Sequence, residues 1–338
     1  MDMNKKIDFY VEVIDNFWDL WFAINLASIM LKNDNYLDIR IFSNDEALFK
    51  NMIKNNTLLT KITYYDLSQI INFEPNNLIF NFFDRKINFN YLNSFNFNIK
   101  LINFWYFLMH KWVETLHMTN YFNDNVEVTH FIPSLLKNTW WILINKIDNY
   151  YKEEFLSYLE KKYDIKFDLQ NYENIVSIFV YKDTLEEILP YLDIANTKYF
   201  IFWYPDKKIN NKNIKIMPFF EFEDYNNFMW ICDINFVRGE NSLISSLIYN
   251  KPTLWDIYKE ENNAHIDKID DFLYFLKWFS NFNIDYIELM NGFNSKSKNI
   301  CFNNFIFDNK KYSKMFEELW NYVNNECNAY EKIKKILN

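Results

Sequence analysis

A chain of 338 residues, half of them apolar, can bury more than one core, so we expect two folded domains and no wholesale disorder. The net charge of −9 argues against a nucleic-acid-binding protein and suits a partner that presents a cationic group. No apolar window approaches the roughly 20 residues of a membrane helix, and no signal peptide is visible, which favours a soluble cytoplasmic protein.

Cysteine and glycine are both scarce. The cysteines at 232, 301 and 327 lack metal-ligand spacing and are odd in number, which fits a reducing compartment. Only Gly239 and Gly292 occur, whereas Phe, Tyr, Asn, Ile and Lys are abundant. Drift in an AT-rich genome explains this bias, so a missing glycine-rich loop does not exclude a phosphate site.

Strand-like and helix-like segments alternate along the first half of the chain. The expected strands span 7–14, 37–42, 78–83 and 101–104, and the expected helices span 18–32 and 46–54. Such alternation predicts βαβ units and a mainly parallel sheet.

A second alternation follows a charged connector. Its expected strands span 175–181, 198–204, 214–219, 234–238 and 253–258, and its expected helices span 184–192, 225–232, 242–249, 266–279 and 312–337. We therefore predict an α/β protein with an N-terminal Rossmann-like domain (1–165), a C-terminal Rossmann-like domain (174–310) and a C-terminal helix (312–338). Whether that helix packs back on the first domain stays open. Ligands of such folds bind at the carboxyl ends of the strands, which predicts a cleft there.

The first candidate site lies where the first strand passes into the first helix. Asp15 and Asp19 are four residues apart at this junction, so both are expected near the carboxyl edge of the sheet. Helix capping is the alternative, since Asp is a common cap.

The second candidate site lies between the expected strand 234–238 and the expected helix 242–249. Its sequence is Arg238-Gly239-Glu240-Asn241-Ser242, and it contains one of the two glycines of the chain. An Arg beside the free N–H groups of a helix N-terminus suits a diphosphate, with Ser242 as a further donor. The alternative is a capping Ser beside a surface Arg.

The third candidate is a set of aromatic residues that could stack on a pyrimidine or ribose, although core packing is the favoured explanation in so aromatic a chain: Phe179, Tyr181, Phe219, Phe222 and Tyr225. The four histidines show no zinc-type spacing, and no Asp-x-Asp pair would hold a nucleotide sugar through a metal.

The segment from Met229 to Ser242 resembles a signature of the protein-arginine rhamnosyltransferases that act on elongation factor P. The similarity continues through 250–258 and Ala264-His265, and it includes Asp15-Asn16-Phe17-Trp18-Asp19 near the start. Looser similarity occurs at 101–106, 111–114 and 176–181, so the resemblance spans nearly the whole chain.

The resemblance implies a GT-B enzyme of two Rossmann-like domains with a cleft between them. It also implies inverting, metal-independent transfer of L-rhamnose from dTDP-β-L-rhamnose to an arginine of elongation factor P, without a cofactor. By position, the catalytic carboxylates would be Asp15, Asp19 and Glu240. The residues that would line the donor site are Phe179, Tyr181, Phe219, Arg238, Asn241 and Ser242.

The chain also departs from the family pattern. Tryptophans stand where the family has glycines, at Trp18, Trp21, Trp140 and Trp141. Asn241 replaces an Asp, and Phe222 stands where Gln is usual. Two other functions therefore remain open: a GT-B transferase with a small-molecule or lipid acceptor, and a non-catalytic binder of elongation factor P.

Overall fold

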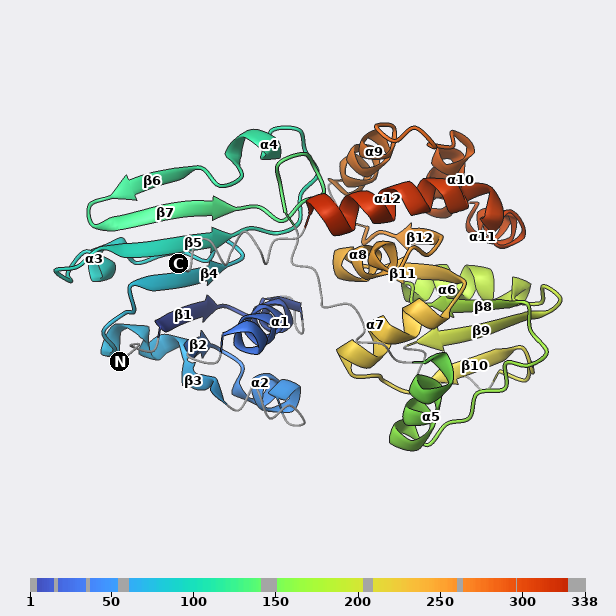
Figure 1. Cartoon of the computed structure of the whole chain (residues 1–338), viewed down its shortest axis with the longest axis horizontal. Coiled ribbons are helices and arrows are strands. Elements are labelled where there is room, and N and C mark those ends of the chain that lie inside the picture. Colours follow the sequence, from blue (N-terminus) through green and yellow to red (C-terminus); the bar gives the residue numbers. More distant parts are fainter. Residues whose placement is uncertain are drawn as a thin grey trace. The chain divides into compact units, whose positions relative to one another are not determined.

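The computed structural model describes residues 5–14, 18–34, 37–53, 61–140, 151–202, 209–259, 264–295 and 297–327. The chain forms two compact units (Figure 1): unit 1 comprises Met1–Ile144 with Glu326–Asn338, and unit 2 comprises Asn145–Asn325. Each unit has its own sheet flanked by helices, which confirms the predicted α/β class.

Unit 1 has a seven-stranded sheet in the order β3-β2-β1-β4-β5-β7-β6. Its strands are β1 (Lys5–Val11), β2 (Leu37–Ser43), β3 (Thr63–Asp66), β4 (Leu78–Phe82), β5 (Ile99–Phe104), β6 (Asn120–Asn123) and β7 (Val126–Phe131). All neighbouring strands pair in parallel except β6 and β7, which pair antiparallel. The strand order reverses between β1 and β4, which is where ligands of open α/β sheets bind.

The helices of unit 1 are α1 (Trp18–Asn33), α2 (Glu46–Ile53), the 3-10 helix η2 (Leu67–Asn72), α3 (Phe89–Leu92) and α4 (Val113–Leu116). Helix α1 follows β1 directly and packs against β1 and β2. Its apolar residues Leu20, Ala27 and Leu31 are fully buried, as the helical spacing predicted.

Unit 2 has a five-stranded, wholly parallel sheet in the order β10-β9-β8-β11-β12. Its strands are β8 (Asn174–Ile178), β9 (Thr197–Phe202), β10 (Ile214–Met217), β11 (Ile234–Arg238) and β12 (Thr253–Asp256). The order reverses between β8 and β11, so the carboxyl ends of these two strands form the topological switch point.

The helices of unit 2 cover this sheet. They are α5 (Lys152–Tyr163), α6 (Lys182–Ile188), α7 (Phe222–Ile231), α8 (Glu240–Ile248), α9 (Ala264–Leu276), α10 (Asp285–Phe293), α11 (Lys298–Phe307) and α12 (Ser313–Glu326), with 3-10 turns η3 (Leu189–Tyr191) and η4 (Asn309–Tyr312). Helix α8 packs against β11 and β12, and α11 packs against α6 and α10.

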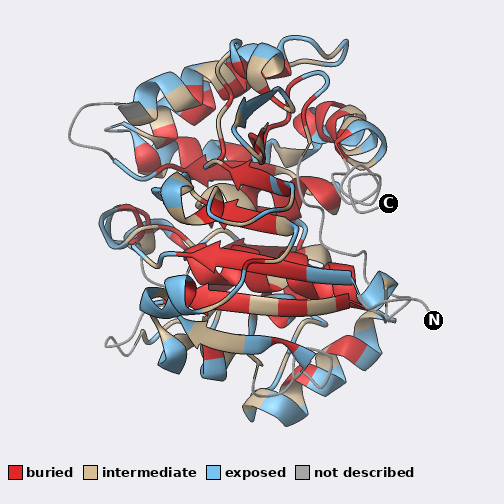
Figure 2. Ribbon diagram, turned by 90° about the vertical axis from the view of Figure 1, so that its left-hand side faces the viewer, coloured by how far each residue is buried: buried red, intermediate tan, exposed pale blue. Residues whose placement is uncertain are grey.

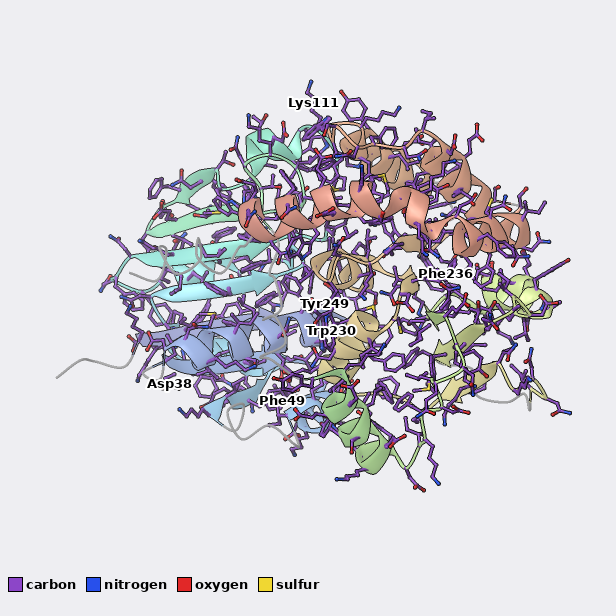
Figure 3. The ribbon with its side chains drawn as sticks, turned by 45° about the vertical axis from the view of Figure 1, so that its right-hand side comes forward. Asp38, Phe49, Lys111, Trp230, Phe236 and Tyr249 are labelled. Carbon is purple, nitrogen blue, oxygen red and sulfur yellow. The ribbon has the colours of Figure 1, made fainter. Side chains whose placement is uncertain are left out.

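Aromatic rings fill both cores, as the composition required. In unit 1, Phe104 stacks on Phe82 with ring centroids 4.9 Å apart, and Phe131 lies 4.7 Å from Phe104. In unit 2, Phe236 of β11, labelled in Figure 3, is fully buried and lies 4.4 Å from Phe302. The inner strands of both sheets are almost wholly buried (Figure 2), whereas the edge strands β3 and β6 are exposed or only partly buried.

The division between the units falls between Ile144 and Asn145, earlier than the expected boundary at residue 165. Helix α5 belongs to unit 2 because Lys162 forms an ion pair with Asp224 at 2.7 Å and Tyr163 stacks on Phe220. Helix α12 also packs in unit 2, where Tyr322 contacts Phe275. From Glu326 onward the chain returns to unit 1.

Candidate functional site

The switch point of unit 2 brings two of the predicted segments together. Phe179 follows β8, and its N–H donates to the carbonyl of Phe236 on β11. Arg238 is the last residue of β11, so it lies at the same sheet edge. The residues after β8 and β11 therefore share the position where α/β sheets bind nucleotides.

Gly239 connects β11 to helix α8 and has φ 68° and ψ 152°. This backbone region is essentially restricted to glycine, which explains why glycine is retained here. Because Gly239 has no side chain, it cannot cap α8 itself. The N–H groups of the first turn of α8 precede the first helical hydrogen bond, from Leu243 to the Gly239 carbonyl, so they suit an anion.

The guanidinium of Arg238 is held between two aromatic rings at the mouth of this turn. Its Cζ lies 4.3 Å from the ring centroid of Phe179 and 5.1 Å from that of Tyr181. Burial lowers the pKa of Arg238, and the neighbouring Tyr181, Tyr225 and Asp256 oppose this effect. Arg238 thus places a stacked cation at the end of β11, and an arginine of this kind is well suited to bind a diphosphate.

The three remaining aromatic candidates differ in their surroundings. Tyr225 is buried and packs against Phe202 at 4.9 Å and Phe179 at 5.2 Å, so core packing explains it. Phe219 is 68% exposed and belongs to the surface of unit 2. Phe222 starts α7, but its side chain lies outside the described residues.

Asn241 and Ser242 occupy the first turn of α8. Asn241 is half-buried, whereas Ser242 is 1% exposed. The hydroxyls of Ser242 and Ser177 partly offset the burial that raises the pKa of Tyr225. The Ser242 side chain thus faces the core, which leaves its backbone N–H as the group best placed for the predicted diphosphate contact.

Glu240 begins α8 and pairs with a lysine that the sequence did not single out. Lys268, on α9, places its Nζ 3.0 Å from Oε1 of Glu240. Both side chains are partly exposed, at 22% for Lys268 and 32% for Glu240. The pair fixes the orientation of one carboxylate oxygen of Glu240.

Asp19 lies in the first turn of α1, in unit 1, and is 1% exposed. Its Oδ2 accepts the backbone N–H of Ile14 at 2.9 Å, and its Oδ1 lies 3.4 Å from the hydroxyl of Tyr106. Asp19 therefore tightens the turn between β1 and α1, which is a structural role close to the capping alternative. Asp15 lies outside the described residues.

Two of the tryptophans that replace family glycines are accommodated in unit 1. Trp21 is 6% exposed within α1. Trp140 forms a bridge with Pro133 and places its ring 4.7 Å from His117. The side chain of Trp18 and all of Trp141 lie outside the described residues.

Within the described ranges, no group of three or more His, Cys, Asp or Glu residues is arranged to hold a metal ion. The three cysteines are buried and form no disulfide with one another. None of the described helices combines the length and the apolar character that crossing a membrane requires.

Sequence comparison decides the family. The model of the family described as "Elongation-Factor P (EF-P) rhamnosyltransferase EarP" matches residues 7–210 and 201–338, which is nearly the whole chain. The chain belongs to this family. Membership of the EarP family agrees with the sequence analysis, in which residues 229–258 resemble a signature of the protein-arginine rhamnosyltransferases.

Individual EarP relatives align only over a short segment. The protein-arginine rhamnosyltransferase of Pseudomonas aeruginosa is 38% identical over 60 residues, which is 18% of this chain and 16% of that protein. The enzyme of Shewanella oneidensis is 32% identical over 66 residues, 20% of this chain and 17% of its own. The aligned segment thus spans about a sixth of the curated relatives it matches.

Solved structures match over the whole chain. A structure described as the basis for EarP-mediated arginine glycosylation of translation elongation factor EF-P is 13% identical, with a TM-score of 0.61 and 98% coverage of both chains. The spinosyn rhamnosyltransferase SpnG complexed with thymidine diphosphate is 8% identical, with a TM-score of 0.55, covering 99% of this chain and 100% of that one. These likenesses establish the fold, and they confirm the predicted GT-B class.

Proposed function

We propose that this protein transfers L-rhamnose from dTDP-β-L-rhamnose to an arginine side chain of translation elongation factor P. The observation that carries the proposal is the EarP family match over nearly the whole chain. The geometry of unit 2 supports the donor half of the reaction, because Arg238 and the N-terminus of α8 lie at the switch point where α/β folds bind nucleotides.

The leaving group in this reaction is thymidine diphosphate. As the bond between the anomeric carbon and the diphosphate oxygen breaks, negative charge develops on that oxygen. Arg238 and the N–H groups of Glu240 to Ser242 supply fixed positive charge of the kind that stabilises such an anion. These donors can serve the role that a divalent metal serves in other transferases, so we propose a metal-independent reaction.

The acceptor nitrogen is a poor nucleophile because a guanidinium is protonated and delocalised. The family resemblance assigns Asp15 and Asp19 of unit 1 and Glu240 of unit 2 as catalytic carboxylates, although both oxygens of Asp19 already contact Ile14 and Tyr106. We propose that carboxylates of this set bind the guanidinium, localise its charge and accept the proton that leaves the attacking nitrogen. That nitrogen forms the new bond to the anomeric carbon while the diphosphate departs from the opposite face, so the configuration inverts. A general base of this kind contributes a factor on the order of 10²–10⁴ in rate.

The test is a transfer assay with purified protein, dTDP-β-L-rhamnose and elongation factor P from the same organism. The expected result is a mass increase of one deoxyhexose on the factor, located by tandem mass spectrometry on a single arginine. Asp15→Asn should abolish transfer and leave donor affinity nearly intact. An unmodified factor, under conditions where another EarP family enzyme modifies its own, would overturn the proposal.

Two binding measurements separate the alternatives. Binding of elongation factor P without binding of dTDP-rhamnose would show a non-catalytic binder. Donor hydrolysis or transfer to a small molecule, with elongation factor P unmodified, would show a different acceptor class.

A further inference from the structure

A buried ion pair lies next to the backbone of Tyr181, one of the two residues whose rings contact Arg238. Asp256, the last residue of β12, is 1% exposed, and Lys298, the first residue of α11, is fully buried. The Lys298 Nζ lies 3.6 Å from Oδ1 of Asp256. Removing two charges from water is costly, so such a pair persists only where further hydrogen bonds satisfy both groups.

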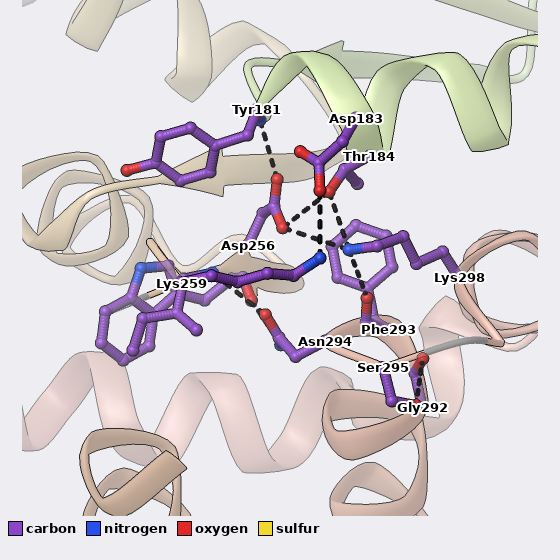
Figure 4. Close-up of polar contacts among 12 residues, drawn as sticks. Tyr181, Asp183, Thr184, Asp256, Lys259, Gly292, Phe293, Asn294, Ser295 and Lys298 are labelled. Atoms are coloured by element: carbon purple, nitrogen blue, oxygen red, sulfur yellow. Dashed lines mark hydrogen bonds and ion pairs between the residues drawn. The ribbon is translucent and has the colours of Figure 1, made fainter. Parts of the chain in front are cut away.

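Those hydrogen bonds converge on the turn between β8 and α6 (Figure 4). Oδ2 of Asp256 accepts the backbone N–H of Tyr181 at 2.8 Å, and Oδ1 accepts the hydroxyl of Thr184 at 2.9 Å. Lys298 donates to the same hydroxyl at 2.7 Å and to the carbonyl of Phe293 at 3.1 Å. The Thr184 hydroxyl therefore donates once and accepts once, which fixes its rotation.

The Asp256 carboxylate also occupies the start of a helix. Tyr181 is the N-cap residue of α6 and makes no side-chain capping bond of its own. A carboxylate from a different strand, β12, supplies the negative charge that this helix N-terminus favours. The start of α6 thereby receives a carboxylate from the protein itself, whereas the N-cap residue of α8, Gly239, offers that helix no side chain.

The same pair is coupled to the donor site through Tyr181 and Arg238. Asp256 is the register partner of Arg238 in the parallel pair of β11 and β12. Its charge is among those that raise the pKa of Arg238 against the effect of burial. The centroid of the Tyr181 ring lies 5.1 Å from Cζ of Arg238. The hydrogen bond from the Tyr181 N–H to Asp256 fixes the backbone from which this ring extends.

We propose that Asp256 and Lys298 are positioning residues for the donor site. They hold the Phe179–Tyr181 turn against Arg238, at the end of β11. This inference rests on the proposed function in one respect, namely that the donor is a nucleoside diphosphate sugar.

The experiment measures dTDP affinity by calorimetry together with thermal unfolding, on the full-length chain. Asp256→Asn should weaken dTDP binding about tenfold, because a neutral amide oxygen holds the Tyr181 N–H less strongly than the carboxylate does. Hydrogen exchange at the Tyr181 amide should accelerate in the same variant. Lys298→Met should be the less stable of the two, because it leaves a buried carboxylate without its cation.

The double variant Asp256→Leu/Lys298→Met separates positioning from general stability. Replacing both charges by apolar groups should restore the melting temperature, since a buried ion pair and a well-packed apolar pair are often similar in stability. It should not restore dTDP affinity, because the Tyr181 N–H still lacks its acceptor. Recovery of affinity together with stability would overturn the positioning role.

The matched control is another buried ion pair, in unit 1. Asp8 is fully buried and binds Arg40 with Nε–Oδ1 at 2.7 Å. Asp8→Asn should lower the melting temperature and leave dTDP affinity unchanged. Equal loss of dTDP affinity in Asp8→Asn and Asp256→Asn would overturn the inference. So would unchanged affinity in Asp256→Asn, whereas wild-type protein that binds no dTDP would overturn the proposed donor itself.

Discussion

The guanidinium of Arg238 lies over the ring of Phe179, with Cζ 4.3 Å from the ring centroid. This contact sets the plane of the guanidinium at the end of β11, beside the uncapped start of α8. Lysine would keep the charge at this position but could not present two parallel N–H donors while stacked.

Arg238→Ala should weaken dTDP binding about tenfold to a hundredfold, the range for lost hydrogen bonds to a charged group. Arg238→Lys should recover only part of this loss. Calorimetric titration with dTDP measures both effects. Lys50→Ala, which removes a cation with a 68% exposed side chain on α2, is the control and should bind dTDP normally. Full recovery by lysine would show that stacking does not matter.

Glu240→Gln should reduce transfer by a factor on the order of 10²–10⁴, because it removes a proposed base, while dTDP affinity changes little. Lys268→Met should lower the turnover rate less, since it only releases the carboxylate oxygen that Lys268 holds at 3.0 Å. Single-turnover assays with elongation factor P, run beside dTDP titrations, measure the two effects. A loss of dTDP affinity in Glu240→Gln equal to its loss of transfer would contradict the catalytic role.

Each retained glycine lies where a side chain would be strained or crowded. Gly239 needs its positive φ, and a Cβ at Gly292 would clash with Sγ of Cys301 in the packing of α10 on α11. Other positive-φ positions that the structure describes are held mainly by Asn and Asp, which tolerate this conformation. Loss of glycine was therefore tolerated wherever a short polar side chain could substitute.

Gly292→Ala should destabilise the protein by about 1–3 kcal/mol, the usual cost of overpacking a core. Without a clash, alanine in a helix would be favoured over glycine by about 1 kcal/mol. A decrease in the free energy of unfolding would therefore indicate the clash with Cys301, and an increase would indicate its absence. Urea unfolding measures it. Cys301→Ala removes the clashing sulfur, and the double variant should regain most of the lost free energy of unfolding. A more stable Gly292→Ala variant would show that Cys301 rotates away without cost.

The sequence predicted the helices and strands that a pattern of neighbouring residues defines. Strand β11 and the turn at Gly239 follow from a buried apolar run, a glycine and a helix, so the position of Arg238 at a strand end could be predicted from the sequence. Lys268 and Lys298 could not be found in this way, because their partners Glu240 and Asp256 are brought to them by tertiary packing alone. Helix α11 was also missed, since its apolar residues are not confined to one face.

The buried imidazole of His117 should make the free energy of unfolding depend on pH. Its ring is 7% exposed and packs against Trp140, with Nδ1 3.1 Å from the backbone nitrogen of Ile132. Burial lowers its pKa from 6.5 to about 4, although contact with the Ile132 backbone opposes the change. The folded protein therefore keeps this imidazole neutral where the unfolded chain protonates it.

Because the unfolded chain binds more protons between pH 6.5 and about 4, the free energy of unfolding should fall as the pH is lowered through this window. Above pH 6.5 the imidazole is neutral in both states and carries no penalty, and the loss of unfolding free energy reaches about 3 kcal/mol below pH 4. His117→Gln should flatten the pH dependence of urea unfolding across that range while lowering stability at neutral pH. A slope in His117→Gln equal to that of the wild type would show that other groups control the acid sensitivity.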